Sequence, residues 1–253
     1  MILVEGKIGT TATHIHGGER IEFRPLDKII SSKNLDLELE VIFEDEYLAV
    51  INKPAGILVS GNRFKTVANA LMQNLKKSDQ ADWAAPKPVH RLDYPTTGLV
   101  LVGKTSASIV ALNQLFENKL ISKTYHAVTI GKMESKGKVT LPIDSKSAIS
   151  EFKVLETIVS ERFDYLNLVE LNPKTGRRHQ LRKHLAALGN PILGDAKYNN
   201  PKLILKGKGL YLNATSLQFK HPFTEVNMRI KLELPKKFRK LFGAIKVSYS
   251  SRI

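Results

Sequence analysis

The sequence predicts an α+β fold in which a sheet of many strands is combined with a few helices. Along the 253 residues, segments rich in apolar and β-branched residues outnumber segments with helical spacing. The two kinds do not alternate strictly, as they would in a doubly wound parallel sheet. No GxGxxG motif follows a predicted strand and no GxxxxGK[ST] motif is present, so dinucleotide and phosphate-loop folds have no support.

The first 38 residues are predicted to form a small appendage, made of a strand pair and a polar linker at 26–38. The main domain is expected over residues 39–243, with a short tail at 244–253. Within that domain the Pro-rich stretch 77–88 is expected to be a loop. Apolar spacing predicts strands at 2–4, 21–23, 39–43, 47–52, 98–102, 123–130, 151–157, 165–171, 209–212, 217–221 and 228–234, and helices at 66–76, 106–116 and 175–188.

The clearest of these helices is the one at 175–188. Leu181, Leu185 and Leu188 form an apolar stripe along it. Gly189 then supplies a left-handed cap and Pro191 cannot continue the hydrogen-bond ladder, so the helix is expected to end there.

The chain is strongly basic. Its 39 Lys and Arg oppose 24 Asp and Glu, which gives a formal net charge of +15 and a pI near 9.8. Such a field concentrates polyanions, so nucleic acid is the first candidate partner and an anionic membrane the second. An unspecialised basic surface is the third reading, and charge alone does not separate the three.

Cysteine is absent, which excludes disulfides, thiolate nucleophiles and Cys-ligated zinc. Glu5 and Lys7 interrupt the apolar stretch at the start, where a signal peptide would need a continuous apolar core. The apolar runs are far shorter than the roughly 20 residues of a membrane-spanning helix. We therefore expect a soluble cytoplasmic protein with no membrane partner.

The segment 89–98, VHRLDYPTTG, has the most concentrated chemistry. Arg91 and Asp93 flank one apolar residue in a turn that leads into a buried strand, and such loops often present reactive side chains. Asp-x-Pro is also good turn chemistry, and on these grounds alone a purely structural role for Asp93 is slightly favoured. His90 precedes this pair.

A second segment, 175–184, carries a cationic cluster near the start of the predicted helix. In a helix, Arg178 and Arg182 would project together because they are four residues apart. The cluster could bind phosphate, pair with a carboxylate from elsewhere, or be a solvated basic face. Its members are Arg177, Arg178, His179, Arg182 and Lys183.

Lys123 and Tyr125 alternate on one side of a predicted strand, where a tyrosine could stack on a base. An ordinary half-exposed strand tyrosine is the commoner case. His179 and His184 are five residues apart and so do not share a helix face as metal ligands would. We expect no metal site, and His184 is expected to be a satisfied, half-buried histidine.

Together these segments resemble the RluA family of RNA pseudouridine synthases. The resemblance covers about residues 39–242, in the family's order. It rests on VIFEDEYLAVINKPAGILV, HRLDYPTTGLVLVGKT, KTYHAVTIG, TGRRHQLRKHLAALGNPILGDAKY and LNATSLQFKHPFTEVNMRIKLELPKKF. It implies a mixed, largely antiparallel central sheet with flanking helices and an RNA-binding cleft. Residues 4–23 resemble the last part of the ribosomal-protein-like RNA-binding module that often precedes this domain.

The resemblance also implies roles. Asp93 matches the catalytic aspartate, Tyr125 the tyrosine that stacks on the target base, and Arg182 the basic residue that pairs with the aspartate. Arg91 matches the arginine that fills the space left by the flipped uridine. The surrounding residues expected to contact RNA are His90, Lys123, Arg177, Arg178, His179 and Lys183.

The implied reaction is the isomerisation of specific uridines in structured RNA, either rRNA or tRNA, by a monomeric enzyme. It involves no redox or phosphoryl change, so no cofactor is expected. Asp93 could attack the sugar or the base, or assist loss of a sugar proton. The alternatives are a non-catalytic RNA-binding or ribosome-assembly factor and a glycosidic-bond hydrolase. Hydrolases usually use two carboxylates, and only one is present at the centre of the motif.

Overall fold

The computed structural model describes residues 2–10, 12–23, 35–205 and 207–242. The chain divides into two compact units, Met1–Asn34 and Leu35–Ile253. The smaller unit contains an antiparallel sheet in the order β2-β1-β3. The predicted strands 2–4 and 21–23 are confirmed as β1 and β3, whereas β2 was not predicted. Most of the predicted linker (26–34) and the tail 244–253 lie outside the described residues. The bounds are Ile2–Val4 for β1, Lys7–Ile8 for β2 and Ile21–Phe23 for β3.

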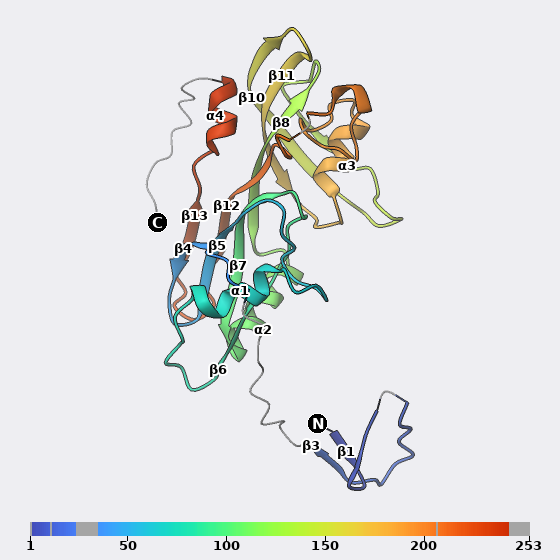
Figure 1. Ribbon diagram of the computed structural model, residues 1–253, viewed down its shortest axis with the longest axis vertical. Coiled ribbons are helices and arrows are strands. Elements are labelled where there is room, and N and C mark those ends of the chain that lie inside the picture. The colour runs from blue at the N-terminus through green and yellow to red at the C-terminus, as the bar shows by residue number, and fades with distance from the viewer. Residues whose placement is uncertain (1, 11, 24–34, 206, 243–253) are drawn as a thin grey trace. The chain divides into compact units, whose positions relative to one another are not determined.

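The larger unit is built on a ten-stranded sheet (Figure 1). Its main path runs β4-β5-β7-β12-β8-β11-β10-β9, with β13 paired to β12 and β6 paired to β7. Among the described strands of this sheet only β7 and β12 pair in parallel, so the predicted mixed, largely antiparallel sheet is confirmed. The strands are Glu40–Glu44 (β4), Leu48–Lys53 (β5), Trp83–Pro88 (β6), Thr97–Thr105 (β7), Ser122–Ile130 (β8), Lys136–Val139 (β9), Ser150–Ser160 (β10), Asp164–Pro173 (β11), Leu212–Lys220 (β12) and Asn227–Lys231 (β13).

The parallel pairing of β7 and β12 depends on a glycine. Gly98 has φ +113° and lies opposite Ala214, so a Cβ at this position would overlap the Ala214 backbone. Ala214 in turn lies opposite Tyr125 of β8. The start of β7 and the Tyr125 position of β8 are therefore separated by one strand, and the loop that precedes β7 is brought to the same part of the sheet.

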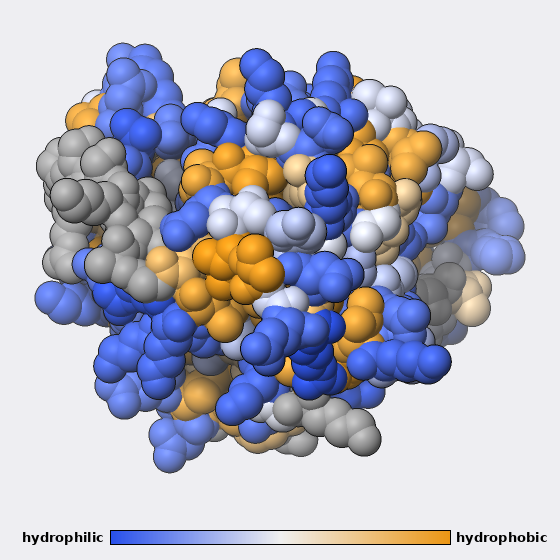
Figure 2. All heavy atoms as spheres, turned by 90° about the horizontal axis from the view of Figure 1, so that it is seen from above, coloured by the Kyte–Doolittle hydropathy of each residue, from blue (hydrophilic) through white to orange (hydrophobic). Residues whose placement is uncertain are grey.

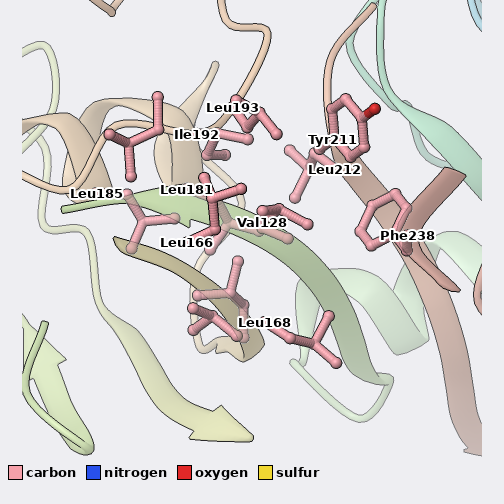
Figure 3. Close-up of a cluster of buried hydrophobic side chains, with 14 of the residues drawn as sticks. Val128, Leu166, Leu168, Leu181, Leu185, Ile192, Leu193, Tyr211, Leu212 and Phe238 are labelled. Carbon is pink, nitrogen blue, oxygen red and sulfur yellow. The ribbon is translucent and has the colours of Figure 1, made fainter. Parts of the chain in front are cut away.

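Within the described residues, four α-helices and one 3₁₀ turn accompany this sheet. Thr66 and Thr105 cap α1 and α2, since each hydroxyl accepts a backbone N–H in the first turn. Leu181 and Leu185 of α3 point into a cluster of side chains from β8, β11, β12 and α4, which fixes α3 against the sheet (Figure 3). The helices are Val67–Asn74 (α1), Ser106–Glu117 (α2), Gln180–Ala187 (α3) and Lys236–Phe242 (α4), and the 3₁₀ turn is Pro201–Leu203 (η1).

Several predicted elements differ from the structure. The stretch 77–88 is not wholly a loop, because its second half forms β6, which pairs only with β7 among the described strands. Proline is tolerated there because the strand is at an edge and its register is irregular between Trp83 and Lys87. The helix predicted at 175–188 begins only at Gln180, because His179 adopts a left-handed conformation with φ 57°. Of the strand expected at 209–212 only Leu212 is in a strand, where it begins β12, and β12 continues through most of the strand expected at 217–221. Neither β9 nor α4 was predicted.

The surface of the molecule is mostly hydrophilic in the view of Figure 2, where hydrophobic residues form patches interrupted by hydrophilic side chains. Within the described residues, the helices lack the length and apolar character needed to cross a membrane.

Candidate active site

A cleft of about 810 Å³ is lined in part by residues of β8, β11 and β12 and contains most of the predicted site residues. Its walls come from the loop before β7, the start of β8, the C-terminal end of α2 and the segment between β11 and α3. The predicted residues that line it are His90, Arg91, Asp93, Lys123, Tyr125, Arg177, Arg178, His179 and Arg182. Segments that are distant in the sequence therefore share one concave surface.

A buried lysine holds the loop that carries Asp93 through hydrogen bonds to its backbone carbonyls. Lys53, at the end of β5, is fully buried and its Nζ donates to the carbonyls of Pro54, Tyr94 and Thr96 at 2.9, 3.3 and 2.8 Å. Burial lowers the pKa of Lys53 to about 8, an effect that the nearby Asp93 charge opposes. These bonds fix the turn on the C-terminal side of Asp93, whose side chain remains 18% exposed to the cleft.

His90 holds the other side of this loop. Its Nε2 accepts the backbone N–H of Leu101 at 2.9 Å, and its ring lies 4.7 Å from that of Phe116. Burial, together with the positive charge of Lys123, lowers the pKa of His90 to about 3, so the ring is neutral. His90 thus joins the loop that carries Asp93 to β7, and it also lines the cleft.

Arg182 reaches Asp93 from the first turn of α3. Its Nη1 lies 3.6 Å from Asp93 Oδ2, while its Nε and Nη2 donate to Asp195 at 2.7 and 2.8 Å. Burial alone would lower the pKa of Arg182, but the hydrogen bonds and charge of Asp195, with a contribution from Asp93, raise it above its usual value. One buried guanidinium therefore lies between two carboxylates.

His179 approaches the second oxygen of Asp93. Its Nε2 lies 3.8 Å from Asp93 Oδ1, and its Nδ1 is 2.8 Å from the hydroxyl of Tyr198. Burial, opposed by Asp93 and assisted by Arg182, lowers the pKa of His179. The left-handed backbone of His179 ends the loop and starts α3, and so directs the ring toward the cleft.

Tyr125 contributes an aromatic ring to the cleft. It is half-buried on β8, and burial together with the negative charge of Asp93 raises the pKa of its phenol above the usual range. The side chain is therefore a neutral phenol at physiological pH. Its ring can face a planar group bound beside Asp93.

Several cationic side chains also line the cleft. Arg91 and Arg178 are exposed, whereas Arg177 is partly fixed because its Nε donates to the Ser147 carbonyl at 3.1 Å. Lys123 lies 5.7 Å from the Phe116 ring, and burial lowers its pKa. Lys183 lies away from the cleft and pairs with Asp144 at 3.0 Å.

Two parts of the sequence interpretation need correction. Arg178 precedes α3, so it does not project together with Arg182 from one helix face: Arg178 is exposed and Arg182 is buried. His184 is satisfied as expected, by Ser150 Oγ at 3.0 Å and the Leu141 carbonyl at 2.9 Å, but it is buried rather than half-buried. The described residues contain no cluster of His, Asp and Glu suited to a metal ion.

The sequence interpretation missed Lys53, Asp195 and Tyr198. The signal for Asp195 was a charged residue directly after a glycine. In the structure Gly194 has φ +78° and contacts the Gly209 carbonyl, so no side chain fits at this position. The signal for Lys53 was a lysine at the end of a strand whose first four residues are apolar, where burial demands hydrogen-bond partners.

Comparison with known proteins assigns the family. A family model described as RNA pseudouridylate synthase matches residues 47–187. "Ribosomal large subunit pseudouridine synthase C" of Rickettsia bellii (strain RML369-C) is 35% identical over 218 residues, which are 79% of this chain and 70% of that protein. "tRNA pseudouridine synthase C" of Vibrio vulnificus (strain CMCP6) is 32% identical over 233 residues, covering 81% of this chain and 94% of that protein.

A solved structure extends this assignment to the fold. "Human RNA Pseudouridylate Synthase Domain Containing 4" matches with a TM-score of 0.64 and 26% identity, and the match covers 79% of this chain and 90% of that chain. The chain therefore belongs to the RNA pseudouridylate synthase family, in its RluA-type branch, and is an RNA pseudouridine synthase.

Proposed function

We propose that this enzyme isomerises specific uridines of a structured ribosomal or transfer RNA, with Asp93 as the catalytic carboxylate. The observation that carries the proposal is the position of Asp93. Its carboxylate lies 3.6 Å from the guanidinium of Arg182, and both residues line the same cleft as Tyr125. The printed names of two relatives refer to the large ribosomal subunit and to tRNA, which supports these two RNA classes as substrates.

The chemistry fits one carboxylate in a partly enclosed cleft. The reaction breaks the N1–C1′ bond, turns the uracil and joins C5 to C1′. The hydrogen on C5 leaves as a proton and N1 gains one, so substrate and product are isomers and no co-reactant is consumed. A carboxylate can attack the sugar or the base, or take a proton from the sugar, and each route uses an ionised Asp93.

The base must leave the RNA stack before it can react, which costs a few kcal/mol. We propose that stacking on the neutral Tyr125 ring offsets this cost and that Arg91, exposed at the cleft, occupies the vacated space. Lys123, Arg177, Arg178 and His179 would contact the neighbouring phosphates. Such contacts position the RNA and carry little sequence information.

The test is nucleoside mass spectrometry with position mapping, applied to rRNA and tRNA from a strain that lacks the gene. The strain is complemented with the wild type, with Asp93→Ala, or with Glu233→Gln, which changes an exposed carboxylate outside the cleft. We expect one or more pseudouridines to disappear on deletion and to return with the wild type and Glu233→Gln only.

Two outcomes would contradict the proposal. If Asp93→Ala restores the modification, Asp93 is not the catalytic carboxylate. If deletion changes no pseudouridine in rRNA or tRNA, these RNAs are not the substrates, and binding of the protein to the same RNAs should then be measured.

A further inference from the structure

Two side chains near the cleft have no role in the proposed reaction, although both contact residues that do. Asp195 and Tyr198 lie in the segment between α3 and η1, and neither lines the cleft. Asp195 is 1% exposed. An ionised carboxylate is rarely buried to this extent unless hydrogen bonds and a partner charge hold it.

Asp195 fixes the guanidinium of Arg182 in one orientation. Its two oxygens accept from Nε and Nη2 in a two-pronged pair, which leaves Nη1 to face Asp93 at 3.6 Å. The carboxylate is itself held, because Oδ1 also accepts the backbone N–H groups of Lys197 at 2.9 Å and Tyr198 at 3.2 Å. Rotation of the guanidinium away from Asp93 would break both bonds to Asp195.

Tyr198 acts on the two residues that face Asp93. Its ring lies 5.0 Å from Arg182 Cζ and its hydroxyl lies 2.8 Å from His179 Nδ1. When this hydroxyl donates to Nδ1, the neutral imidazole carries its proton on Nε2, the atom that lies 3.8 Å from Asp93 Oδ1. In this tautomer the imidazole presents an N–H to the carboxylate, and the hydroxyl holds the ring in that orientation.

The segment that carries both side chains is fixed in place. Gly194, next to Asp195, packs so closely on the Gly209 carbonyl that a Cβ would collide with it. The preceding Leu193 and Ile192 are buried in the core that also holds α3 (Figure 3). The backbone of Asp195 and Tyr198 is thus held by the core. Asp195 contacts Arg182, which faces Oδ2 of Asp93, and Tyr198 contacts His179, which faces Oδ1.

We infer that Asp195 and Tyr198 are positioning residues, which orient Arg182 and His179 so that each faces one oxygen of Asp93. The inference rests on the proposed function. It assigns no contact with RNA to either residue. Loss of either one should slow the chemical step and leave RNA affinity nearly unchanged, whereas a purely structural role would lower only stability.

The experiment is a pair of double-mutant cycles. Total RNA from the deletion strain is incubated with excess full-length enzyme, and pseudouridine is followed over time by mass spectrometry. RNA affinity is measured by filter binding, and folding is checked by circular dichroism. The first cycle uses Asp195→Asn, Arg182→Gln and the double variant of the two. The second uses Tyr198→Phe, His179→Gln and their double variant. The matched controls are Glu44→Gln, which weakens the buried pair with Lys104 outside the cleft, and Tyr211→Phe.

We expect Asp195→Asn and Tyr198→Phe to lower the rate constant about tenfold or more, the size of effect seen when the orienting partner of a metal ligand is removed. The RNA dissociation constant should change less than about twofold, because neither residue lines the cleft. A tenfold change would correspond to about 1.4 kcal/mol of lost binding. In the Arg182→Gln and His179→Gln backgrounds the second substitution should have no further effect, because its partner is already absent. The two controls should keep the wild-type rate constant.

Three results would decide against the inference or its basis. A wild-type rate constant for folded Asp195→Asn and Tyr198→Phe would overturn it, as would rate losses that multiply in the double variants. If Asp195→Asn does not fold, Tyr198→Phe decides alone, since it removes one oxygen and keeps the ring. If the wild type itself yields no pseudouridine, it is the proposed function that fails.

Discussion

Replacement of Arg182 by methionine should destabilise the protein as well as slow the reaction. It leaves Asp195, which is 1% exposed, as a buried charge that has lost its 2.7 and 2.8 Å partner. Removal of one member of a buried ion pair typically costs about 3–5 kcal/mol. In a protein of this size each kcal/mol lowers the Tm by about 2–4 °C, so the Tm should fall by about 6–20 °C.

The double variant Arg182→Met/Asp195→Asn should recover most of this loss without recovering turnover. No charge is then buried, and the amide oxygen of the introduced asparagine can still accept the backbone N–H groups of Lys197 and Tyr198, as Asp195 Oδ1 does. Arg182 Nη1, however, is still absent from the position beside Asp93. Stability and activity should therefore separate in the double variant, as measured by thermal denaturation and by pseudouridine formation.

The pH dependence gives an independent check of the cause. In the wild type, burial alone would raise the pKa of Asp195, but Arg182 and two backbone N–H groups lower it, so its contribution is present above the unfolded pKa and is lost as the pH falls. In Arg182→Met, burial should raise this pKa above the unfolded value. The penalty is then present at neutral pH and disappears on acidification. The Tm difference between the two proteins should therefore shrink as the pH is lowered from about 8 toward about 4.

A double variant as unstable as Arg182→Met would refute this reasoning, because the buried charge of Asp195 could not then be the cause. A Tm difference that stays constant with pH would do the same. Recovery of turnover in the double variant would show that the arginine is dispensable for catalysis.

Three further predictions concern other parts of the protein. Lys53→Met should remove the Nζ donor from the carbonyls of the loop, of which that of Tyr94 keeps the N–H of Gly56, and should speed hydrogen exchange in the loop after Asp93. Burial lowers the pKa of Lys53 to about 8, below its unfolded value of 10.5, so the wild type gains stability as the pH rises between these two values. The measured destabilisation by Lys53→Met should therefore grow over that pH range. Gly98→Ala should prevent folding, judged by circular dichroism, because its Cβ would overlap Ala214, whereas the control Gly189→Ala, at φ +80° in open space, should cost only about 1–2 kcal/mol. Arg178→Gln should weaken binding to all RNA sequences alike and reduce the salt dependence of the affinity by about one unit of slope, and an unchanged slope would show that Arg178 contacts no phosphate.

Much of the larger sheet was predictable because its strands are apolar and bounded by turn residues. The hairpin of β4 and β5, the strand β7 and the helices α1 and α2 follow directly from such patterns. Two predictions failed, those of the loop at 77–88 and of the start of the helix at 175, because neither structure follows from the local residue pattern. The β6 strand contains two prolines and exists because β7 offers it an edge, and the start of α3 is set by the conformation of one residue, His179.

The site was predictable to the extent that its residues lie in compact motifs. The sequence placed Asp93, Tyr125 and Arg182 in three separate segments, and the resemblance to a family grouped them. It did not separate roles within a motif. His90 and Arg91 are adjacent, yet His90 accepts a backbone N–H beneath the loop and Arg91 is exposed in the cleft. That difference depends on the direction of each side chain, which the order of residues does not contain.

The arrangement of the site depends on one row of three residues across the sheet. Gly98 lies opposite Ala214, and Ala214 lies opposite Tyr125, so the loop of Asp93 and the ring of Tyr125 are set by the register of β12 between them. Directly after Ala214, β12 has a bulge at Thr215, and the Thr215 hydroxyl lies 2.7 Å from His126 Nδ1. Because a one-residue slip of register would turn Tyr125 to the other face, β12 determines the geometry of the site although Leu212 is its only residue that lines the cleft.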